Sequence, residues 1–274
     1  MLYTIHITDD LYPNLLKQIH DPPETLYAQG DLSLLSKPGL AIVGMRRCSK
    51  RGENLAFDWA RRLSRQGLTI VSGLAFGIDA AAHRGAMEGS GKTIAVVPAC
   101  LPEVMPRSHR KLADEILAKG GLLLSEWDLP RPTRRHDYLV RNRVVSGLSR
   151  GVLVVEAAHK SGAINTAIHA LSQNREIMAV PGHPNEIESQ GCLRLLKEGA
   201  AMVRSTVEVL EALGLEYKKE QQLELPIELK TLYQSIRAAP KTVAELPEGS
   251  ISKLTQLELQ GLLKRDRFGR YAVA

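Results

Sequence analysis

Apolar and polar positions follow a regular order from residue 40 onward. Short, almost continuously apolar runs alternate with longer segments in which apolar residues recur every three or four positions. The apolar runs predict strands at about 40–44, 68–72, 93–97, 121–125, 151–156, 176–180 and 200–203. The periodic segments predict helices at about 51–66, 78–88, 108–119, 138–148, 163–173, 189–198 and 205–213. Because strands without polar alternation are buried on both faces, we expect an α/β fold with a doubly wound, mainly parallel sheet.

The two ends of the chain do not follow this order. Near the start, the pattern predicts a small helix from Asp9 through Gln18 and an extended edge segment at Thr25–Ala28. Near the end, it predicts helices at 228–237, 242–246 and 250–264 and a turn and strand at 267–273, which resembles a winged-helix module. We therefore expect a short N-terminal extension packed on the core at 1–39, an α/β domain at 40–214, a linker at 215–226 and a winged-helix-like domain at 227–274.

Composition narrows the class of protein. Among the 274 residues, three widely spaced cysteines argue against a disulfide framework or a paired-cysteine metal site. No apolar run approaches the roughly 20 residues that span a bilayer, and no signal segment opens the chain. We therefore expect a cytoplasmic protein with no membrane partner. The formal net charge of +6 is only moderately basic, so the distribution of cations is more informative than their total.

The cations form two clusters, each of which follows a predicted strand. The first holds Arg46, Arg47, Lys50 and Arg51, and the second holds Arg131, Arg134, Arg135, Arg141, Arg143 and Arg150. A solvated surface explains either cluster alone about as well as a ligand does. Because both clusters follow strands of one predicted sheet, a shared anionic ligand is favoured.

Two predicted strand-to-helix turns are suited to an anion. They run from Ala41 to Arg47 and from Ile70 to Asp79. Glycines at 44, 73 and 77 let the backbone approach an anion, and each following helix start offers free N–H groups. Arg46 and Arg47 add fixed positive charge. The turns therefore indicate a nucleic-acid backbone or another phosphate ligand beyond the carboxyl ends of the strands.

Motifs of cofactor-dependent and catalytic sites are missing or out of context. The string Gly89-Ser90-Gly91-Lys92-Thr93 lies between a helix and a strand, the reverse of the order in an ATP-binding P-loop, and no GxGxxG fingerprint is present. Asp79 and His83 are interpreted as a helix-start charge and a surface or packed histidine rather than as an acid–base pair or half of a metal site. Glu126 and Glu156 are interpreted as groups that orient nearby arginines, with simple ion pairs as an equal alternative. We expect no cofactor, no metal and no enzymatic activity.

Several segments, taken in order, resemble the DNA-processing protein A (DprA/Smf) family. They are Ile42-Val43-Gly44-Met45-Arg46, Val71-Ser72-Gly73-Leu74-Ala75-Phe76-Gly77-Ile78-Asp79, Gly120-Gly121-Leu122-Leu123-Leu124-Ser125-Glu126, Arg141-Asn142-Arg143-Val144-Val145-Ser146-Gly147-Leu148-Ser149, Val155-Glu156-Ala157, Ser161-Gly162 and Ala179-Val180-Pro181-Gly182. Each string is short, but their order and spacing over residues 10–210 are specific. The chain departs from the family pattern at Met105, Leu139 and Leu193.

The resemblance implies an extended Rossmann-like domain without a nucleotide cofactor, followed by a winged-helix-like module. It implies a homodimeric protein that binds single-stranded DNA and loads the recombinase RecA during DNA uptake, and it places the Gly-x-Arg turn and the Arg-Asn-Arg stretch in the DNA pocket. With the other residues of the anion turns and the nearest aromatic side chain, the candidate DNA-binding residues are Gly44, Arg46, Arg47, Ser72, Gly73, Gly77, Tyr138, Arg141, Asn142, Arg143, Lys160, Ser161 and Gly162.

In this interpretation, arginines contact phosphates and Tyr138 stacks on a base. Arg46 and Arg143 must then line one groove. Two alternatives remain open at this point. One is a nucleotide or phosphoribosyl hydrolase of a related Rossmann-like family, although this chain has only Pro181-Gly182-His183 where those enzymes carry a longer glycine-rich turn. The other is a duplex-DNA regulator that acts through the C-terminal module, whose predicted last helix mixes Lys253 and Lys264 with Glu258.

Overall fold

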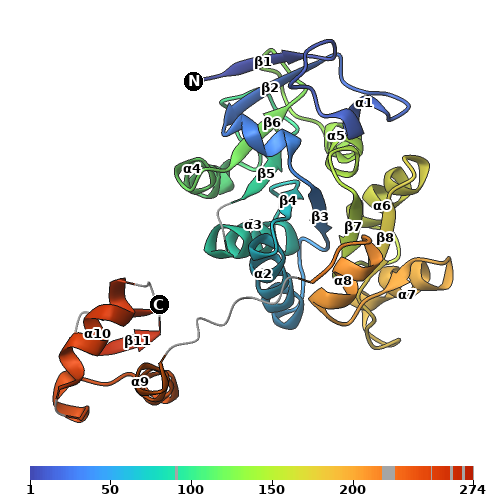
Figure 1. Ribbon diagram of the computed structural model, residues 1–274. Helices are drawn as coiled ribbons and strands as arrows, with labels where there is room; N and C mark the ends of the chain where they lie inside the picture. The colour runs from blue at the N-terminus through green and yellow to red at the C-terminus, as the bar shows by residue number, and fades with distance from the viewer. Residues whose placement is uncertain (90–91, 218–225, 248, 260–261, 267–268, 274) are drawn as a thin grey trace. The chain divides into compact units, whose positions relative to one another are not determined.

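The computed structural model describes residues 1–89, 92–217, 226–247, 249–259, 262–266 and 269–273. The chain forms two compact units, Met1–Tyr217 and Lys218–Ala274, which we describe separately. Within the described residues, the larger unit is built on a nine-stranded sheet with the order β1-β2-β6-β5-β4-β3-β7-β8-β9 (Figure 1).

Seven neighbouring strands of this sheet run parallel. They are β3 (Gly39–Val43), β4 (Thr69–Ser72), β5 (Thr93–Val96), β6 (Leu122–Ser125), β7 (Gly151–Val154), β8 (Glu176–Ala179) and β9 (Ala201–Met202). Every residue of β3 to β7 is buried, as the continuous apolar runs require. The predicted α/β fold with a mainly parallel, Rossmann-like sheet is therefore confirmed.

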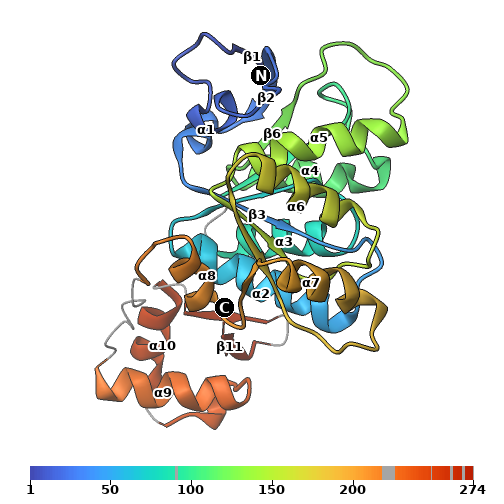
Figure 2. The same cartoon turned by 90° about the vertical axis from the view of Figure 1, so that its right-hand side faces the viewer.

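Helices cover both faces of the sheet because side chains alternate along each strand. In β3, Leu40 and Ile42 face one layer, and Ala41 and Val43 face the other. The first layer contains α2 (Lys50–Arg65), α3 (Ile78–Gly89), α4 (Arg110–Ala118) and α8 (Thr206–Ala212), and the second contains α1 (Asn14–Lys17), α5 (Arg135–Gly147), α6 (Gly162–Ser172) and α7 (Ile187–Lys197) (Figures 1 and 2). Among the described residues, the helices lack the combined length and apolar content needed to cross a membrane.

The N-terminal segment contributes two strands to the same sheet. β1 (Tyr3–His6) pairs antiparallel with β2 (Thr25–Gly30), and β2 pairs antiparallel with β6. The extended segment at Thr25–Ala28 is therefore present, but β1 and not β2 forms the edge of the sheet. β1 buries only Ile5 of its four residues, so its sequence carries little strand signal. The predicted helix from Asp9 is reduced to α1, because the Asp9 carboxylate accepts a hydrogen bond from the His6 amide in a turn.

The smaller unit has its own apolar core. It contains α9 (Ile227–Ala238), a 3-10 turn η3 (Val243–Glu245), α10 (Ser250–Leu259), β10 (Leu263–Arg265) and β11 (Tyr271–Val273), and the two strands pair antiparallel. Leu232, Leu254 and Leu257 pack together between α9 and α10. The helix predicted to reach Lys264 ends at Leu259 in the described residues, and Lys264 belongs to β10. Most of the predicted linker, residues 218–225, lies outside the described residues.

Candidate nucleic-acid interface

The carboxyl ends of the parallel strands meet at one edge of the sheet, and the strand order reverses at β3. β4 lies on one side of β3 and β7 lies on the other. Ligands of α/β sheets bind at such a reversal. At this position the end of β3, the β4–α3 connection, α5 and the start of α6 enclose a pocket of about 70 Å³. Its lining includes the predicted residues Gly44, Arg46, Gly73, Tyr138, Arg141, Asn142 and Gly162.

Arg46 provides the exposed positive charge of this pocket. Its guanidinium carbon lies 5.0 Å from the centre of the Tyr138 ring, a cation–π contact between the β3–α2 connection and α5. Within the described residues, the Arg46 side chain forms no hydrogen bond or ion pair, so its N–H donors are available to a ligand. The stacked pair offers phosphate oxygens a planar donor and offers a base a flat surface.

Glycine is required at two turns beside the pocket. A side chain at Gly73 would place its Cβ 2.6 Å from the guanidinium of Arg141. Gly77 has a φ of +71°, which L side chains rarely adopt, and a Cβ there would collide with the carbonyl oxygen of Met45. Both positions lie in the predicted anion turn, and both keep its backbone close to the β3–α2 connection.

Arg141 supports the pocket from inside the protein rather than extending into solvent. Only 3% of its surface is exposed, and its guanidinium donates hydrogen bonds to the carbonyl oxygens of Gly73 and Val96. Burial lowers the pKa of Arg141 to about 10, and the nearby Asp79 carboxylate opposes this change. The expectation that Arg141 presents free charge to phosphates is therefore corrected: its donors hold the ends of β4 and β5 together.

Asp79 and His83 have separate structural roles. The Asp79 carboxylate accepts hydrogen bonds from the amides of Gly73 at 3.1 Å and Ala75 at 3.4 Å. Burial raises the pKa of Asp79, whereas Arg141 and these amides act in the opposite direction. His83 is fully buried with its Nδ1 atom 2.8 Å from the Thr93 hydroxyl, and burial lowers its pKa to about 3. A packed, neutral histidine is confirmed at His83.

The periodicity of α5 separates its pocket residues from Arg143. Tyr138, Asn142 and Val145 recur at the spacing of one helix face, and all three line the pocket. Arg143 lies about 200° around the helix from Arg141, because each residue advances about 100°. Its guanidinium pairs with Glu126 at 2.8 Å and with Asp21 at 2.9 Å. Burial acts to lower the pKa of Arg143, but these carboxylates raise it overall.

Arg143 therefore does not line the pocket with Arg46, and the expected shared groove is not formed by these two residues. Glu126 forms an ion pair with Arg143 away from the pocket, which is the simple ion-pair alternative and not the orientation of a pocket arginine. Glu156, by contrast, has no arginine partner in the part of the chain that the structure describes. Its carboxylate accepts hydrogen bonds from the Ser49 amide at 2.8 Å and the Ser49 hydroxyl at 2.5 Å, which fixes the start of α2.

The remaining predicted residues lie around the pocket without lining it. Arg47 is exposed in the same connection as Arg46, and the buried Ser72 hydroxyl donates to the Ile42 carbonyl at 2.7 Å. Ser161 caps α6 by accepting a hydrogen bond from the Ile164 amide, and Lys160 is exposed just before it. Asn142 does line the pocket, and its amide donates to the Gly162 carbonyl at 3.2 Å and thereby joins α5 to α6.

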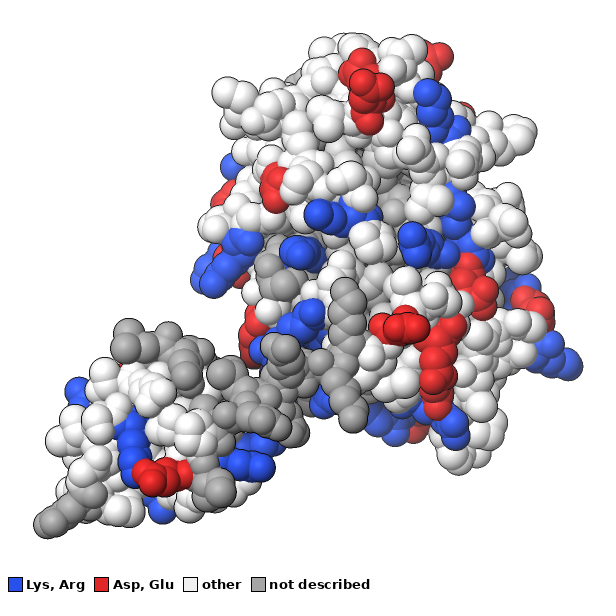
Figure 3. Space-filling model, in the orientation of Figure 1, with Lys and Arg blue, Asp and Glu red and all other residues white. Residues whose placement is uncertain are grey.

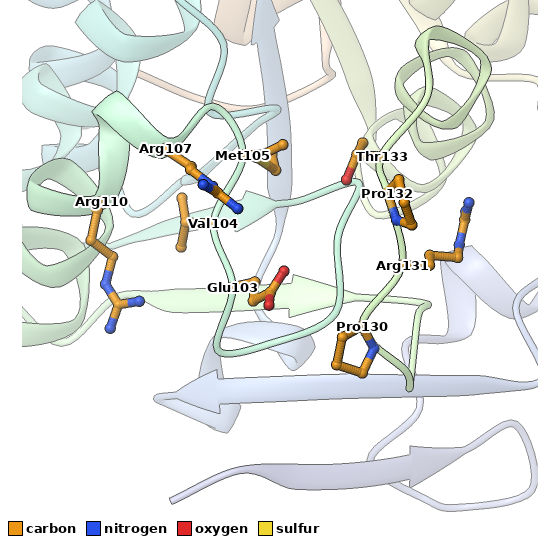
Figure 4. Close-up of a pocket in the computed structure, with 9 residues that line it drawn as sticks. All are labelled: Glu103, Val104, Met105, Arg107, Arg110, Pro130, Arg131, Pro132 and Thr133. Carbon is orange, nitrogen blue, oxygen red and sulfur yellow. The ribbon is translucent and has the colours of Figure 1, made fainter.

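A larger cleft of about 790 Å³ lies between the β5–α4 and β6–α5 connections, and sequence reasoning missed it (Figure 4). Arg107 extends toward the space between the two connections, where Glu103 also lies (Figure 4). Within the described residues, the Arg107 side chain has no hydrogen-bond or ion-pair partner, whereas Arg110 pairs with Asp114 at 3.1 Å. The signal that could have found this cleft is Arg107 itself, which follows a predicted strand in a proline-containing loop.

The pocket and the cleft are neighbours along the same edge of the sheet. Ala75 lines the pocket, and the next residue, Phe76, is 45% exposed and packs edge-on against His109 with ring centres 4.5 Å apart. His109 lies two residues after Arg107, which lines the cleft. On the far wall, Arg131 stacks over the Trp127 ring at 3.7 Å. Exposed cations and flat side chains thus extend from the pocket to the cleft.

Comparison with known proteins identifies the family. The family model described as "DNA recombination-mediator protein A" matches residues 3–214. The DNA processing protein DprA of Bacillus subtilis is 39% identical over 77% of this chain and 71% of its own length, and the protein Smf of Escherichia coli is 42% identical over 77% of this chain and 56% of its own length. The match thus spans little more than half of the Escherichia coli protein.

A solved structure of DNA processing protein A from Helicobacter pylori, described for its single-stranded DNA binding mode, superposes with a TM-score of 0.70 at 32% identity and covers 78% of this chain and 95% of that one. The family model covers most of the larger unit, including every element that encloses the pocket and the cleft. The chain therefore belongs to the DNA recombination-mediator protein A family, the DprA/Smf proteins.

Proposed function

We propose that this chain is a cytoplasmic, non-enzymatic protein that binds single-stranded DNA and loads RecA during DNA uptake and recombination. The observation that carries the DNA-binding part is the free Arg46 guanidinium stacked on Tyr138 beside two backbone turns at the strand reversal. Family membership and the single-stranded DNA binding described for the Helicobacter pylori relative support the same class of ligand.

The pocket and the cleft together suggest how a single strand of DNA is held. The pocket, at about 70 Å³, is smaller than the roughly 300–1,000 Å³ of typical ligand sites, so it suits a phosphate group or the edge of a base. The cleft, at about 790 Å³, has room for the following nucleotides, and Arg107 supplies an unpaired donor there. Phe76 lies exposed between the two and offers a surface for stacking. A flexible single strand can follow this curved path, whereas a stiff duplex cannot.

In this proposal, four of the candidate DNA-binding residues shape the pocket and do not themselves contact DNA. Arg141 holds the ends of β4 and β5 through the carbonyls of Gly73 and Val96. Arg143 fixes α5 against Glu126 and Asp21. Gly73 and Gly77 keep the β4–α3 connection close to the pocket. Direct contacts are then assigned to Arg46, Tyr138 and backbone amides.

The test compares two neighbouring arginines. Arg46→Ala removes the pocket cation, and Arg47→Ala removes an equally exposed cation from the same connection that does not line the pocket. A short fluorescent oligonucleotide is titrated with each variant at 50 and 200 mM salt. Loss of a charged hydrogen bond of about 1.5–3 kcal/mol predicts roughly 10- to 150-fold weaker binding for Arg46→Ala. We expect less than a threefold change for Arg47→Ala, and equal losses in both variants would refute the assignment of the pocket.

A second experiment tests whether the bound DNA strand reaches the cleft. Arg107→Ala should weaken binding of a 20-nucleotide strand more than binding of a four-nucleotide strand, because only the longer strand reaches the cleft. Equal losses for both lengths would place Arg107 in the same contact as Arg46. A duplex competitor of the same length should displace the single strand poorly.

RecA loading, homodimer formation and a winged-helix role for the smaller unit are further parts of the proposal. The family description as a recombination mediator supports RecA as the partner. Ile168 and Leu171 are exposed on one side of α6, at 55% and 71%, which supports an apolar contact between subunits. RecA filament growth on DNA coated with single-strand-binding protein tests the first point, and sedimentation of Leu171→Glu tests the second.

The two alternative functions have less support. For a hydrolase, Asp79 is the acid among the residues that line the pocket, but its carboxylate already accepts hydrogen bonds from the amides of Gly73 and Ala75. Glu156 at the end of β7 already binds Ser49 at the start of α2. For a duplex regulator acting through the smaller unit, Lys253 is the single Lys or Arg of α10 (Ser250–Leu259), and it is paired with Glu228 at 2.6 Å, so the charge of this helix is partly neutralised. Assays for nucleotide hydrolysis and for duplex binding by the full chain test both.

A further inference from the structure

Six of the seven connections that enter the parallel strands carry positive charge and no acid, and the connection into β9 contains Glu198. In six of them, the four residues before the strand include one lysine or arginine and neither aspartate nor glutamate. The six cations, which precede β3, β4, β5, β6, β7 and β8, are Lys37, Arg65, Lys92, Lys119, Arg150 and Arg175. Because the amino ends of parallel strands meet at one edge, these residues share the edge opposite the pocket.

Backbone hydrogen bonds confirm this placement. The amide of Arg150 donates to the Gly39 carbonyl at 2.8 Å, and the amide of Ile70 donates to the Lys92 carbonyl at 3.1 Å. In the strand order β6-β5-β4-β3-β7-β8, the cations follow one another across five interstrand steps. At about 4.8 Å per step, the row is roughly 24 Å long. Figure 3 shows several Lys and Arg side chains across the middle of the larger unit, with Asp and Glu side chains above and below them.

Most of this row lacks internal counter-charges. Within the described residues, the side chains of Lys37, Lys92, Lys119 and Arg150 form no hydrogen bond or ion pair, and all except the half-buried Lys92 are exposed. Arg175 donates to the Leu15 carbonyl at 2.7 Å. At the opposite edge, by contrast, acids neutralise several arginines, as in the contacts of Arg131 with Asp137 and of Arg143 with Glu126.

Stabilisation of the helix carboxyl ends explains only part of this positive charge. The covering helices end at the same edge, and cations near their carboxyl ends stabilise each helix by about 0.3–1 kcal/mol. Stability of the helices does not require acids to be absent from all six connections. Three acids also lie at this edge: Glu176 begins β8, the amide of the exposed Asp31 donates to the Gly121 carbonyl before β6, and Glu198 precedes β9. The six cations outnumber these acids, so the row keeps a net positive charge.

We propose that the amino edge of the sheet binds the phosphate backbone of duplex DNA. A row of about 24 Å spans roughly seven base pairs at 3.4 Å each, so it can reach those phosphates of both strands that face one side of a duplex. The six connections contain no Phe, Tyr or Trp, so they offer none of the stacking surfaces that select single strands. A linear row also fits a linear polyanion better than it fits a compact acidic patch on a protein. This site is independent of the single-strand pocket and would let one molecule hold a single strand and a duplex on opposite edges.

The test removes three exposed cations of the row together, as Lys37→Gln, Lys119→Gln and Arg150→Gln in the full chain. A matched control removes three exposed cations elsewhere, as Arg84→Gln, Lys111→Gln and Lys230→Gln. Binding of a fluorescent 20-base-pair duplex is measured from 50 to 200 mM salt, and thermal melting checks that both proteins are folded.

We expect the row variant to bind the duplex at least tenfold more weakly at 50 mM salt. Its slope of log affinity against log salt should fall by about 2–3, because each phosphate contact contributes about 0.9. The control should change duplex affinity less than threefold, and a four-nucleotide single strand should bind both variants as it binds the native protein. Equal duplex affinity and salt slope in the row variant and the control would overturn the proposal, whatever the outcome at the pocket.

Discussion

Replacing Arg141 with methionine tests whether this residue supports the pocket or contacts DNA. The native guanidinium is buried, binds the carbonyls of Gly73 and Val96, and faces the buried Asp79 carboxylate. Methionine has a similar length but no charge, so Asp79 would remain buried without its main opposing charge. Removing one partner of a buried charge pair costs about 3–5 kcal/mol. For a unit of this size, each kcal/mol corresponds to about 2–4 °C, so we expect Tm to fall by roughly 6–20 °C.

The stability lost in Arg141→Met should also depend on pH. Burial raises the pKa of Asp79, and Arg141→Met removes a charge that opposes the rise. A carboxyl group with a raised folded-state pKa stabilises the fold fully below its unfolded pKa, and this contribution is lost as the pH rises through the folded-state pKa. The stability deficit of Arg141→Met relative to the native protein should therefore be smaller at pH 5 than at pH 8.

Urea denaturation followed by circular dichroism at both pH values measures the deficit, and oligonucleotide titration of the folded variant measures binding. Arg143→Met is the control, because Arg143 and its partner Glu126 are partly exposed and the cost of separating them is smaller. If Arg141→Met melts within about 2 °C of the native protein at pH 8 but loses DNA binding, Arg141 is a ligand and the structural role assigned to it is refuted.

Three further predictions concern the same region. Gly73→Ala should lower Tm and weaken oligonucleotide binding together, because its Cβ would lie 2.6 Å from the Arg141 guanidinium; unchanged melting would contradict this contact. Tyr138→Ala should weaken binding of a short strand about 5- to 150-fold through loss of base stacking, whereas Tyr138→Phe should retain most of it; equal losses in titrations of the two would point to the hydroxyl instead. His83 has a pKa lowered to about 3 by burial, so stability should decline as the pH falls from about 6.5 toward 3, where the unfolded chain takes up a proton that the folded protein does not. His83→Leu should reduce this decline. If urea denaturation shows the same loss of stability between pH 6.5 and 3 in the variant and the native protein, His83 is not its cause.

The central sheet could be predicted from the sequence because its strands are buried on both faces. A strand such as β7, Gly151–Val154, has no polar position, and such a run stands out from the amphipathic helices around it. The same reasoning missed β1, where only Ile5 is buried and three polar or exposed neighbours hide the strand. It also extended the last helix to Lys264, because β10 has only three residues, too few for a strand pattern to show, and is recognised by its pairing with β11.

Part of the candidate site could also be predicted, because it depends on local sequence and on parallel strand pairing. The turns that hold Gly44 and Gly73 are local, so their sequence identifies them, and parallel strands necessarily bring their carboxyl ends to one edge. The structure accordingly places Arg46 beside Tyr138. The cleft at Arg107 could not be predicted, because it is formed by two irregular connections whose shapes depend on packing against each other.

What the sequence determined by itself was therefore the layered sheet and the anion-binding turns at its carboxyl edge, since periodicity and parallel pairing follow from short-range order along the chain. What only the tertiary structure decided was the direction of each side chain. Arg141 and Arg143 are two residues apart and chemically identical, yet one lies under the pocket and the other faces Glu126 on a different side of α5. Their roles depend on how that helix is rotated against the sheet, which is set by contacts between segments far apart in the sequence.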